Sequence, residues 1–160
     1  MARKHRRTSK RGPPRVPQRK SYRVGRAPTG LGLFATVPIR KGAFIVAYRG
    51  RRITHAQAAR KEARGARYMF ELNSRWTIDG SSRRNAARYA NHACRPNAES
   101  ALSNGKLVLR AIKTIEAGEE ITFDYGKEYF DLFIKPTGCQ CAHCQTRSLE
   151  RRKASRRQTS

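Results

Sequence analysis

The sequence has no long hydrophobic run and few acidic residues. No apolar stretch among the 160 residues approaches the roughly 18 that a membrane-spanning helix needs, so no such helix is expected. The basic N-terminus is not followed by an apolar segment, which argues against a secretory signal and favours an intracellular, thiol-reducing compartment. Only 11 Asp and Glu accompany 36 Lys and Arg, and a formal net charge of +25 favours polyanionic partners.

Basic residues concentrate at both ends of the chain. Residues 1–20 hold nine Lys or Arg and no acid, and residues 147–160 carry a net charge of +5. Segments with so much charge and so little to bury are predicted to be a disordered arm and a flexible tail. The remaining net charge of +11 lies on residues 21–146. Hydrophobic residues make up 38% of the whole chain, which is enough for one small core.

Short apolar runs separated by Gly and Pro predict a mostly β fold with short helices. One helix is expected to begin after Thr54, a suitable N-cap residue, and to stop at Gly65. A short helical turn is expected over residues 85–90. The expected strands cover residues 22–26, 32–36, 44–49, 68–73, 76–78, 100–102, 107–111 and 120–123.

The four cysteines form a pattern typical of a structural zinc site. Three lie in the segment Cys139-Gln-Cys-Ala-His-Cys144, and Cys94 precedes them by 45 residues. Thiolates this close repel one another unless a cation neutralises them, and Zn²⁺ accepts four sulfurs at about 2.3 Å. The alternative is free or disulfide-bonded cysteines in a flexible tail, which a reducing compartment disfavours. Zinc bound by Cys94, Cys139, Cys141 and Cys144 would fold the tail back beside Cys94, with His143 left in a solvated loop.

Three further strings carry little information alone. They are Gly30-Leu-Gly-Leu-Phe-Ala35, Asn91-His-Ala-Cys-Arg-Pro-Asn97 and Glu119-Glu-Ile-Thr-Phe-Asp-Tyr-Gly126, with Tyr48-Arg-Gly50 and Tyr68-Met-Phe-Glu71 between them. Together, in this order and followed by the cysteine cluster, they are highly specific. The set resembles the SET-domain protein lysine methyltransferases with a post-SET zinc segment, over about residues 21–145.

The resemblance implies a fold of small curved sheets with a pseudoknot-like core. It places a SET domain at residues 21–135 and a post-SET zinc segment at residues 136–146, between the basic arm and the basic tail. It also implies transfer of a methyl group from S-adenosylmethionine to the side-chain amine of a protein lysine. In this family the cofactor and the peptide lie on opposite faces, joined by a narrow channel.

The resemblance further implies a set of cofactor-binding residues. Glycines in the first string would let the backbone approach the cofactor closely. An aromatic ring would pack on the adenine, and polar side chains would hold the adenine and methionine ends. The implied residues are Gly30, Leu31, Gly32 and Leu33 through their backbone, Asn91 and His92 at the two ends, Arg88 and Tyr129 along the pocket, and Tyr68 and Tyr125.

The implied catalytic residues are aromatic. Tyr125 would aim the lysine amine with its hydroxyl, while Tyr48, Tyr68 and Phe123 would line the lysine channel, with Phe70 completing its apolar wall. A free lysine has a pKa of about 10.4, and only its neutral form attacks. An apolar channel disfavours the ammonium form, whereas a carboxylate would favour it. Because Phe123 leaves more room than a tyrosine would, we expect methylation beyond the monomethyl product.

The alternatives differ in class. Any one of the aromatic residues, taken alone, would be interpreted as part of the core. A catalytically silent, SET-shaped module that associates with nucleic acid is one alternative to the enzyme. A plain nucleic-acid-binding zinc protein is another, but it leaves residues 91–97 and 119–126 without a purpose.

The partners implied are a protein that presents a lysine and, through the basic arms, nucleic acid. A substrate on a nucleoprotein, a histone-like protein or an acidic protein is hypothesised, since a basic body repels a lysine-rich tail unless acidic groups or nucleic acid intervene. The arms themselves are candidate automethylation substrates at Lys4, Lys10 and Lys20. The location expected is cytoplasmic or nucleoid- or chromatin-associated.

Overall fold

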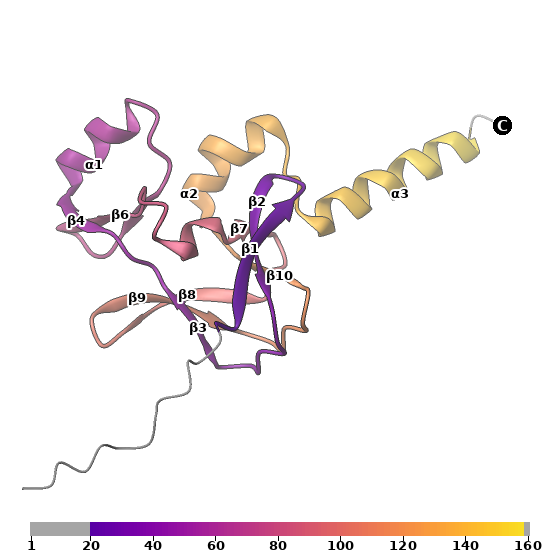
Figure 1. Cartoon of the computed structure of the whole chain (residues 1–160). Helices are drawn as coiled ribbons and strands as arrows, with labels where there is room; N and C mark the ends of the chain where they lie inside the picture. Colours follow the sequence, from indigo (N-terminus) through magenta and orange to yellow (C-terminus); the bar gives the residue numbers. More distant parts are fainter. Residues whose placement is uncertain (1–19, 159–160) are drawn as a thin grey trace, which may run out of the picture.

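The computed structural model describes residues 20–158, so residues 1–19 of the expected basic arm lie outside the described range. Three small sheets pack around one core, and short helices connect and flank them (Figure 1). The expected mostly β fold is confirmed. Within residues 20–158 no helix is long and apolar enough to cross a lipid bilayer.

The sheets have four, three and three strands. The first has the order β1 (Tyr22–Ala27), β2 (Gly30–Ala35), β10 (Glu120–Phe123) and β7 (Asn91–His92). The second has the order β3 (Phe44–Ala47), β9 (Lys106–Ala111) and β8 (Ala98–Ser103). The third has the order β4 (Arg51–Thr54), β6 (Trp76–Asp79) and β5 (Met69–Glu71).

The expected helix is confirmed as α1 (His55–Glu62), and its N-terminus has the predicted cap. The Gln57 backbone N–H donates to Thr54 Oγ1 at 3.3 Å, and the Thr54 backbone N–H donates to Gln57 Oε1 at 3.0 Å. This reciprocal pair satisfies two N–H groups that have no partner inside the helix. The other helical segments are η1 (Ala86–Tyr89), α2 (Lys127–Tyr129), η2 (Phe130–Ile134), η3 (Lys135–Thr137) and α3 (Ala142–Gln158).

The core joins the first two sheets. Leu33 of β2, Leu109 of β9, Ile121 of β10 and Ile115 of the preceding loop are all 0% exposed. Burying a side chain of this size contributes roughly 1.5–3 kcal/mol each. These contacts fix β10 between two layers and thereby fix the polar segments at both of its ends.

Strand β10 is threaded between two segments that are distant in sequence. It pairs antiparallel with β2 on one side and parallel with β7 on the other. Asn97, which is buried, spans the crossing: its Nδ2 donates to the Glu120 carbonyl at 2.8 Å, and its Oδ1 accepts from the Thr122 N–H at 2.8 Å. The two motifs at residues 91–97 and 119–126 thus interlock, as the pseudoknot-like expectation requires.

The structure corrects one expectation and adds two strands. The tail from residue 147 was expected to be flexible, but α3 continues through Gln158 and projects away from the sheets (Figure 1). Its sequence is dominated by Arg, Gln, Lys, Ala and Leu, which favour a helix even when charged. Strands β4 and β7 had not been expected; β7 has only two residues, too few to produce a periodic pattern.

Replacing Asn97 by Ala should destabilise the fold by about 2–4 kcal/mol, because it leaves a buried backbone carbonyl and N–H of β10 without partners. Urea unfolding followed by circular dichroism would measure this loss. The control is Glu99→Ala, at an exposed position of the neighbouring strand β8, which should change stability by only about 0.5 kcal/mol. Equal midpoints for the two variants would contradict the locking role of Asn97.

Candidate active site

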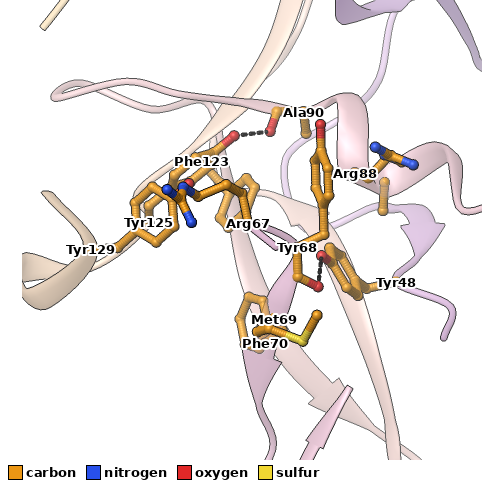
Figure 2. Close-up of a pocket in the computed structure, with 11 residues that line it drawn as sticks. Tyr48, Arg67, Tyr68, Met69, Phe70, Arg88, Ala90, Phe123, Tyr125 and Tyr129 are labelled. Carbon is orange, nitrogen blue, oxygen red and sulfur yellow. Dashed lines mark hydrogen bonds between the residues drawn. The ribbon is translucent and has the colours of Figure 1, made fainter. Parts of the chain in front are cut away.

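A small pocket collects the aromatic residues that the sequence singled out. Its volume is about 80 Å³, and its walls include every residue expected in the lysine channel: Tyr48, Tyr68, Phe70, Phe123 and Tyr125. In Figure 2, Tyr125, Tyr129 and Arg67 lie on one side of this pocket, and Tyr48, Tyr68 and Arg88 on the other. We call this cavity the tyrosine pocket.

Two hydroxyl groups in the tyrosine pocket are held by backbone carbonyls (Figure 2). Tyr125 donates to the Ala90 carbonyl at 2.8 Å, and Tyr48 donates to the Tyr68 carbonyl at 3.1 Å. Burial raises the pKa of both Tyr125 and Tyr48 far above the usual value. Both hydroxyls are therefore neutral, and each keeps lone pairs that can accept a further hydrogen bond.

Ring contacts complete the wall of the pocket. The Phe123 ring centroid lies 4.8 Å from that of Tyr125 and 6.5 Å from that of Phe70, and Phe70 lies 5.5 Å from Tyr48. Gly80 allows the last of these positions, because a Cβ atom there would overlap the Tyr48 ring. The result is an apolar enclosure in which a charged amine would lose its hydration.

The parallel pairing of β7 with β10 positions Tyr125. The Tyr125 backbone N–H donates to His92 Nδ1 at 3.3 Å, and the two rings meet edge-on with centroids 5.6 Å apart. Burial lowers the pKa of His92, partly offset by Asp124, and a neutral imidazole suits its acceptor role. The neighbouring Asn91 donates through Nδ2 to the Leu31 carbonyl at 3.0 Å and to Glu120 Oε1 at 2.7 Å.

A larger cleft of about 700 Å³ adjoins the tyrosine pocket, and Arg67, Tyr125 and Tyr129 line both. Of the expected cofactor-binding residues, Asn91, His92, Tyr125 and Tyr129 lie on this cleft, whereas Tyr68 and Arg88 lie on the tyrosine pocket. The backbone string at residues 30–33 lines neither cavity. The preceding turn, at Pro28 and Thr29, reaches the cleft instead.

Arg88 carries an unsatisfied donor. Its Nη1 donates to the Ser81 carbonyl, and its guanidinium carbon lies 3.7 Å from the centroid of the Tyr68 ring. Its Nε atom is buried without a hydrogen-bond partner in the described part of the chain. An unpaired buried guanidinium N–H is costly, so this atom is suited to an anionic group bound in the cavity.

The sequence did not reveal several lining residues. Arg67 lines both cavities, with its guanidinium 4.8 Å from the Phe133 ring centroid. Leu132, Phe133 and Ile134 of η2 form one wall of the cleft. Two features of the sequence could have indicated them: Arg67 directly precedes Tyr68, and an apolar run follows Tyr129.

A third cavity adjoins the tyrosine pocket and also shares Tyr125, Tyr129, Leu132 and Phe133 with the larger cleft. This groove, of about 500 Å³, lies between α1, β5 and α2, and it shares Met69, Phe70, Tyr125 and Tyr129 with the tyrosine pocket. Glu62, Glu71 and Glu128 line it, and none of the three is in an ion pair within residues 20–158. We call it the acidic groove; it leaves the tyrosine pocket open to two larger cavities.

The four cysteines come together as expected. Their sulfur atoms all lie within 4.8 Å of one another, with Cys94 Sγ 3.7 Å from Cys139 Sγ and 3.6 Å from Cys144 Sγ. Tetrahedral zinc with sulfurs at about 2.3 Å separates them by about 3.8 Å, so the four sulfurs fit Zn²⁺. His143 is not among the clustered ligands in the described residues.

The cysteine cluster closes one end of the larger cleft. Cys139 and Cys141 are among its lining residues, and Cys94 Sγ lies 3.6 Å from His92 Nε2. A metal ion bound to these sulfurs would hold the C-terminal segment against the motif that positions Tyr125. The metal would therefore be structural, with four protein ligands and no open position for chemistry.

Removing one ligand should test this site. In Cys139→Ser the zinc content, measured by mass spectrometry after dialysis against a weak chelator, should fall well below one ion per chain, and the melting temperature should drop because metal binding stabilises the fold. His143→Ala, in the same segment, is the control and should keep its zinc. Equal zinc content in both variants would contradict the assignment.

Comparisons with known proteins agree with this geometry. The sequence model of the SET domain matches residues 30–126. Histone-lysine N-methyltransferase trithorax of Drosophila virilis is 33% identical over 125 residues, covering 72% of this chain and 3% of that protein. Histone-lysine N-methyltransferase Set2 of Drosophila melanogaster is 35% identical over 126 residues, covering 72% and 5%.

Solved structures give the same result. The polycomb repressive complex 2 of Chaetomium thermophilum matches with a TM-score of 0.64 and 32% identity over 71% of this chain and 16% of that one. A second structure of the complex, in an autoinhibited conformation bound to S-adenosylmethionine, matches with a TM-score of 0.58 and 31% identity over 67% and 15%. The chain thus spans only a small part of the relatives it matches. Because the SET-domain match covers more than half of its 160 residues, the chain belongs to the SET-domain family.

Proposed function

We propose that this chain is an S-adenosylmethionine-dependent protein-lysine N-methyltransferase. The observation that carries the proposal is the tyrosine pocket, which shares lining residues with the larger cleft and with the acidic groove. Tyr125 and Tyr129 line all three cavities, so a lysine from the acidic groove and a methyl donor in the larger cleft would meet at these residues. In-line transfer would require the nucleophile and the leaving group to lie on opposite sides of the methyl group there.

The residues around the larger cleft fit the cofactor. When bound, S-adenosylmethionine would supply the methyl group as a sulfonium electrophile. Arg88 Nε, buried and unpaired in the described chain, lines the adjoining tyrosine pocket and would take the carboxylate from there, and Tyr129 would pack on the adenine. Asn91 and His92 would hold its polar groups. On this proposal the string at residues 30–33 acts through the Leu31 carbonyl, which orients Asn91.

The tyrosine pocket would prepare the lysine amine. An apolar enclosure penalises the ammonium form, and the guanidinium group of Arg67 would lower the amine pKa further. The Tyr125 hydroxyl donates a hydrogen bond to the Ala90 carbonyl. The Tyr125 hydroxyl oxygen would therefore accept an N–H of the substrate amine and orient the nitrogen lone pair. The proton lost from the amine would leave through the open acidic groove to water.

The acidic groove suggests the substrate class. Glu62, Glu71 and Glu128 carry negative charge in an otherwise strongly basic protein, while Lys127, also in the groove, pairs with Asp131. We propose a lysine flanked by basic residues, as in a histone-like protein or nucleoprotein, because such a segment would be attracted here and repelled elsewhere. The proposal includes nucleic acid as a partner of the basic arms, and an intracellular location in the cytoplasm, at a nucleoid or at chromatin.

Methyl transfer can be measured with radiolabelled S-adenosylmethionine and two lysine peptides of equal length, one with arginine and one with glutamate beside the lysine. The wild type should label the basic peptide, and Tyr125→Phe should lose at least about 10²-fold in kcat because the amine is no longer aimed. Equilibrium dialysis should show that Tyr125→Phe still binds the cofactor.

The outcomes separate the alternatives. Label on the enzyme itself would indicate automethylation. If neither peptide is labelled although the protein binds the cofactor, the catalytically silent module would be favoured. Equal labelling of the two peptides would contradict the role of the acidic groove in substrate choice, but it would leave the proposed methyl transfer supported.

Phe123 is proposed to set the extent of methylation. Mass spectrometry after exhaustive turnover should show dimethyl- or trimethyl-lysine with the wild type, because the Phe123 ring leaves room beside the amine. In Phe123→Tyr the added hydroxyl should fill that room and shift the product toward monomethyl-lysine. A wild type that stops at monomethyl-lysine would reject the proposal.

A further inference from the structure

A separate cleft, away from the tyrosine pocket, gathers positive charge. It has a volume of about 500 Å³ and shares no lining residue with the tyrosine pocket, the acidic groove or the larger cleft. Lys20, Arg49 and Arg84 line it and no acidic residue does. None of these three cations is in an ion pair within the described range. We call it the basic cleft.

The three cations come from three chain segments that hydrogen bonds hold in place. Thr36 Oγ1 donates to the Lys20 carbonyl at 2.8 Å, and the Thr36 N–H donates to the Ser21 carbonyl at 2.9 Å. The Arg49 N–H donates to Oδ1 of Asn85, a residue only 1% exposed, at 3.0 Å. Because Asn85 is the neighbour of Arg84, this bond holds both arginine-bearing segments together. The fold therefore fixes the backbone at all three positions, and the exposed cationic side chains extend from it.

The distribution of charge along the chain supports a polyanionic ligand. Residues 1–61 contain 18 of the 36 Lys and Arg and none of the 11 acids. The arm, with eight Lys or Arg in residues 1–19, joins the chain at Lys20, on the wall of the basic cleft. On the side of β3, Arg110 of β9 separates Phe44 from Glu99 of β8, since Arg110 is in register with both residues.

Two aromatic residues indicate which polyanion would bind. Phe44, on the edge strand β3, is 56% exposed, and Tyr22 lies on the same cleft. Neither ring stacks on another aromatic ring within residues 20–158. Cations that follow a phosphate backbone, beside open aromatic faces on which bases stack, are typical of sites for single-stranded nucleic acid. Tyr22 is half-buried against the core, so Phe44 offers the open ring, and an acidic protein would use the cations and leave that ring without a partner.

We propose that the basic cleft binds a nucleic-acid strand, with phosphates against Lys20, Arg49 and Arg84 and a base against Phe44. This interaction goes beyond methyl transfer and does not depend on it. It would hold the protein on a nucleoprotein while the acidic groove remains available to a basic segment of that assembly.

Fluorescence anisotropy with a labelled single-stranded oligonucleotide, without S-adenosylmethionine and over a series of salt concentrations, tests the proposal in the full chain. Each cation lost should reduce the slope of log K against log salt by about 0.7. The double variant Arg49→Ala/Arg84→Ala should therefore lose about 1.4. The bond to Asn85 uses the Arg49 backbone, so the variant should keep its melting temperature.

The matched control is Arg60→Ala/Arg64→Ala, which removes the same charge from α1 and its end. It should change the slope by much less. Phe44→Ala should weaken binding on the order of tenfold, and Phe44→Tyr, which keeps the ring, should restore it.

Four results would overturn the proposal. Equal slopes for the two double variants would mean that charge acts without regard to position. Unchanged affinity in Phe44→Ala, or equal affinity for duplex and single strand, would remove the base contact. Full competition by polyglutamate at equal charge would assign the basic cleft to acidic proteins. All four are read from binding, so they are distinguishable from a failure of methyl transfer.

Discussion

The parallel pairing of β7 with β10 is the constraint on which the site depends. It places Tyr125 beside His92, and it brings Cys94 close to Cys139 of the C-terminal segment. Register matters here because side chains alternate along a strand. A slip of β10 by one residue would exchange the buried Ile121 and Phe123 with Thr122, and the core and the tyrosine pocket would be lost together. Stability and site geometry are therefore determined by the same contacts.

The chemistry of the tyrosine pocket follows from what surrounds it. Its polar groups are neutral hydroxyls and guanidinium groups, and no carboxylate lines it. A carboxylate would stabilise an ammonium ion, whereas raised pKa values keep Tyr48 and Tyr125 neutral over the physiological range. A pocket of this composition would orient an amine while disfavouring its charged form, as the proposed reaction requires. Proximity and desolvation are the sources of rate enhancement that such an enclosure offers.

Charge is divided between the cavities of this small protein. The acidic groove beside the tyrosine pocket carries three unpaired carboxylates, while the basic cleft carries three cations and no acid. On the proposed function, the carboxylates of the acidic groove would attract a basic substrate segment that the rest of a basic body repels. Screening limits such attraction to roughly 10 Å around each surface.

The sequence by itself determined the family, most of the strands, the cap of α1, the four cysteines and the aromatic residues of the tyrosine pocket. These features are local: they rest on alternation, on a capping residue or on the order of short motifs. Helix propensity by itself would have predicted the helical tail, whereas its high charge suggested a flexible one. Only the tertiary structure decided that β7 pairs with β10, that Arg67 lines two cavities, that residues 30–33 lie off the cleft while the Leu31 carbonyl accepts from Asn91, and that Lys20, Arg49 and Arg84 share a surface. Each of these depends on contacts between segments far apart in the chain, and a periodic pattern tells which face of a strand is buried but not which strand it meets.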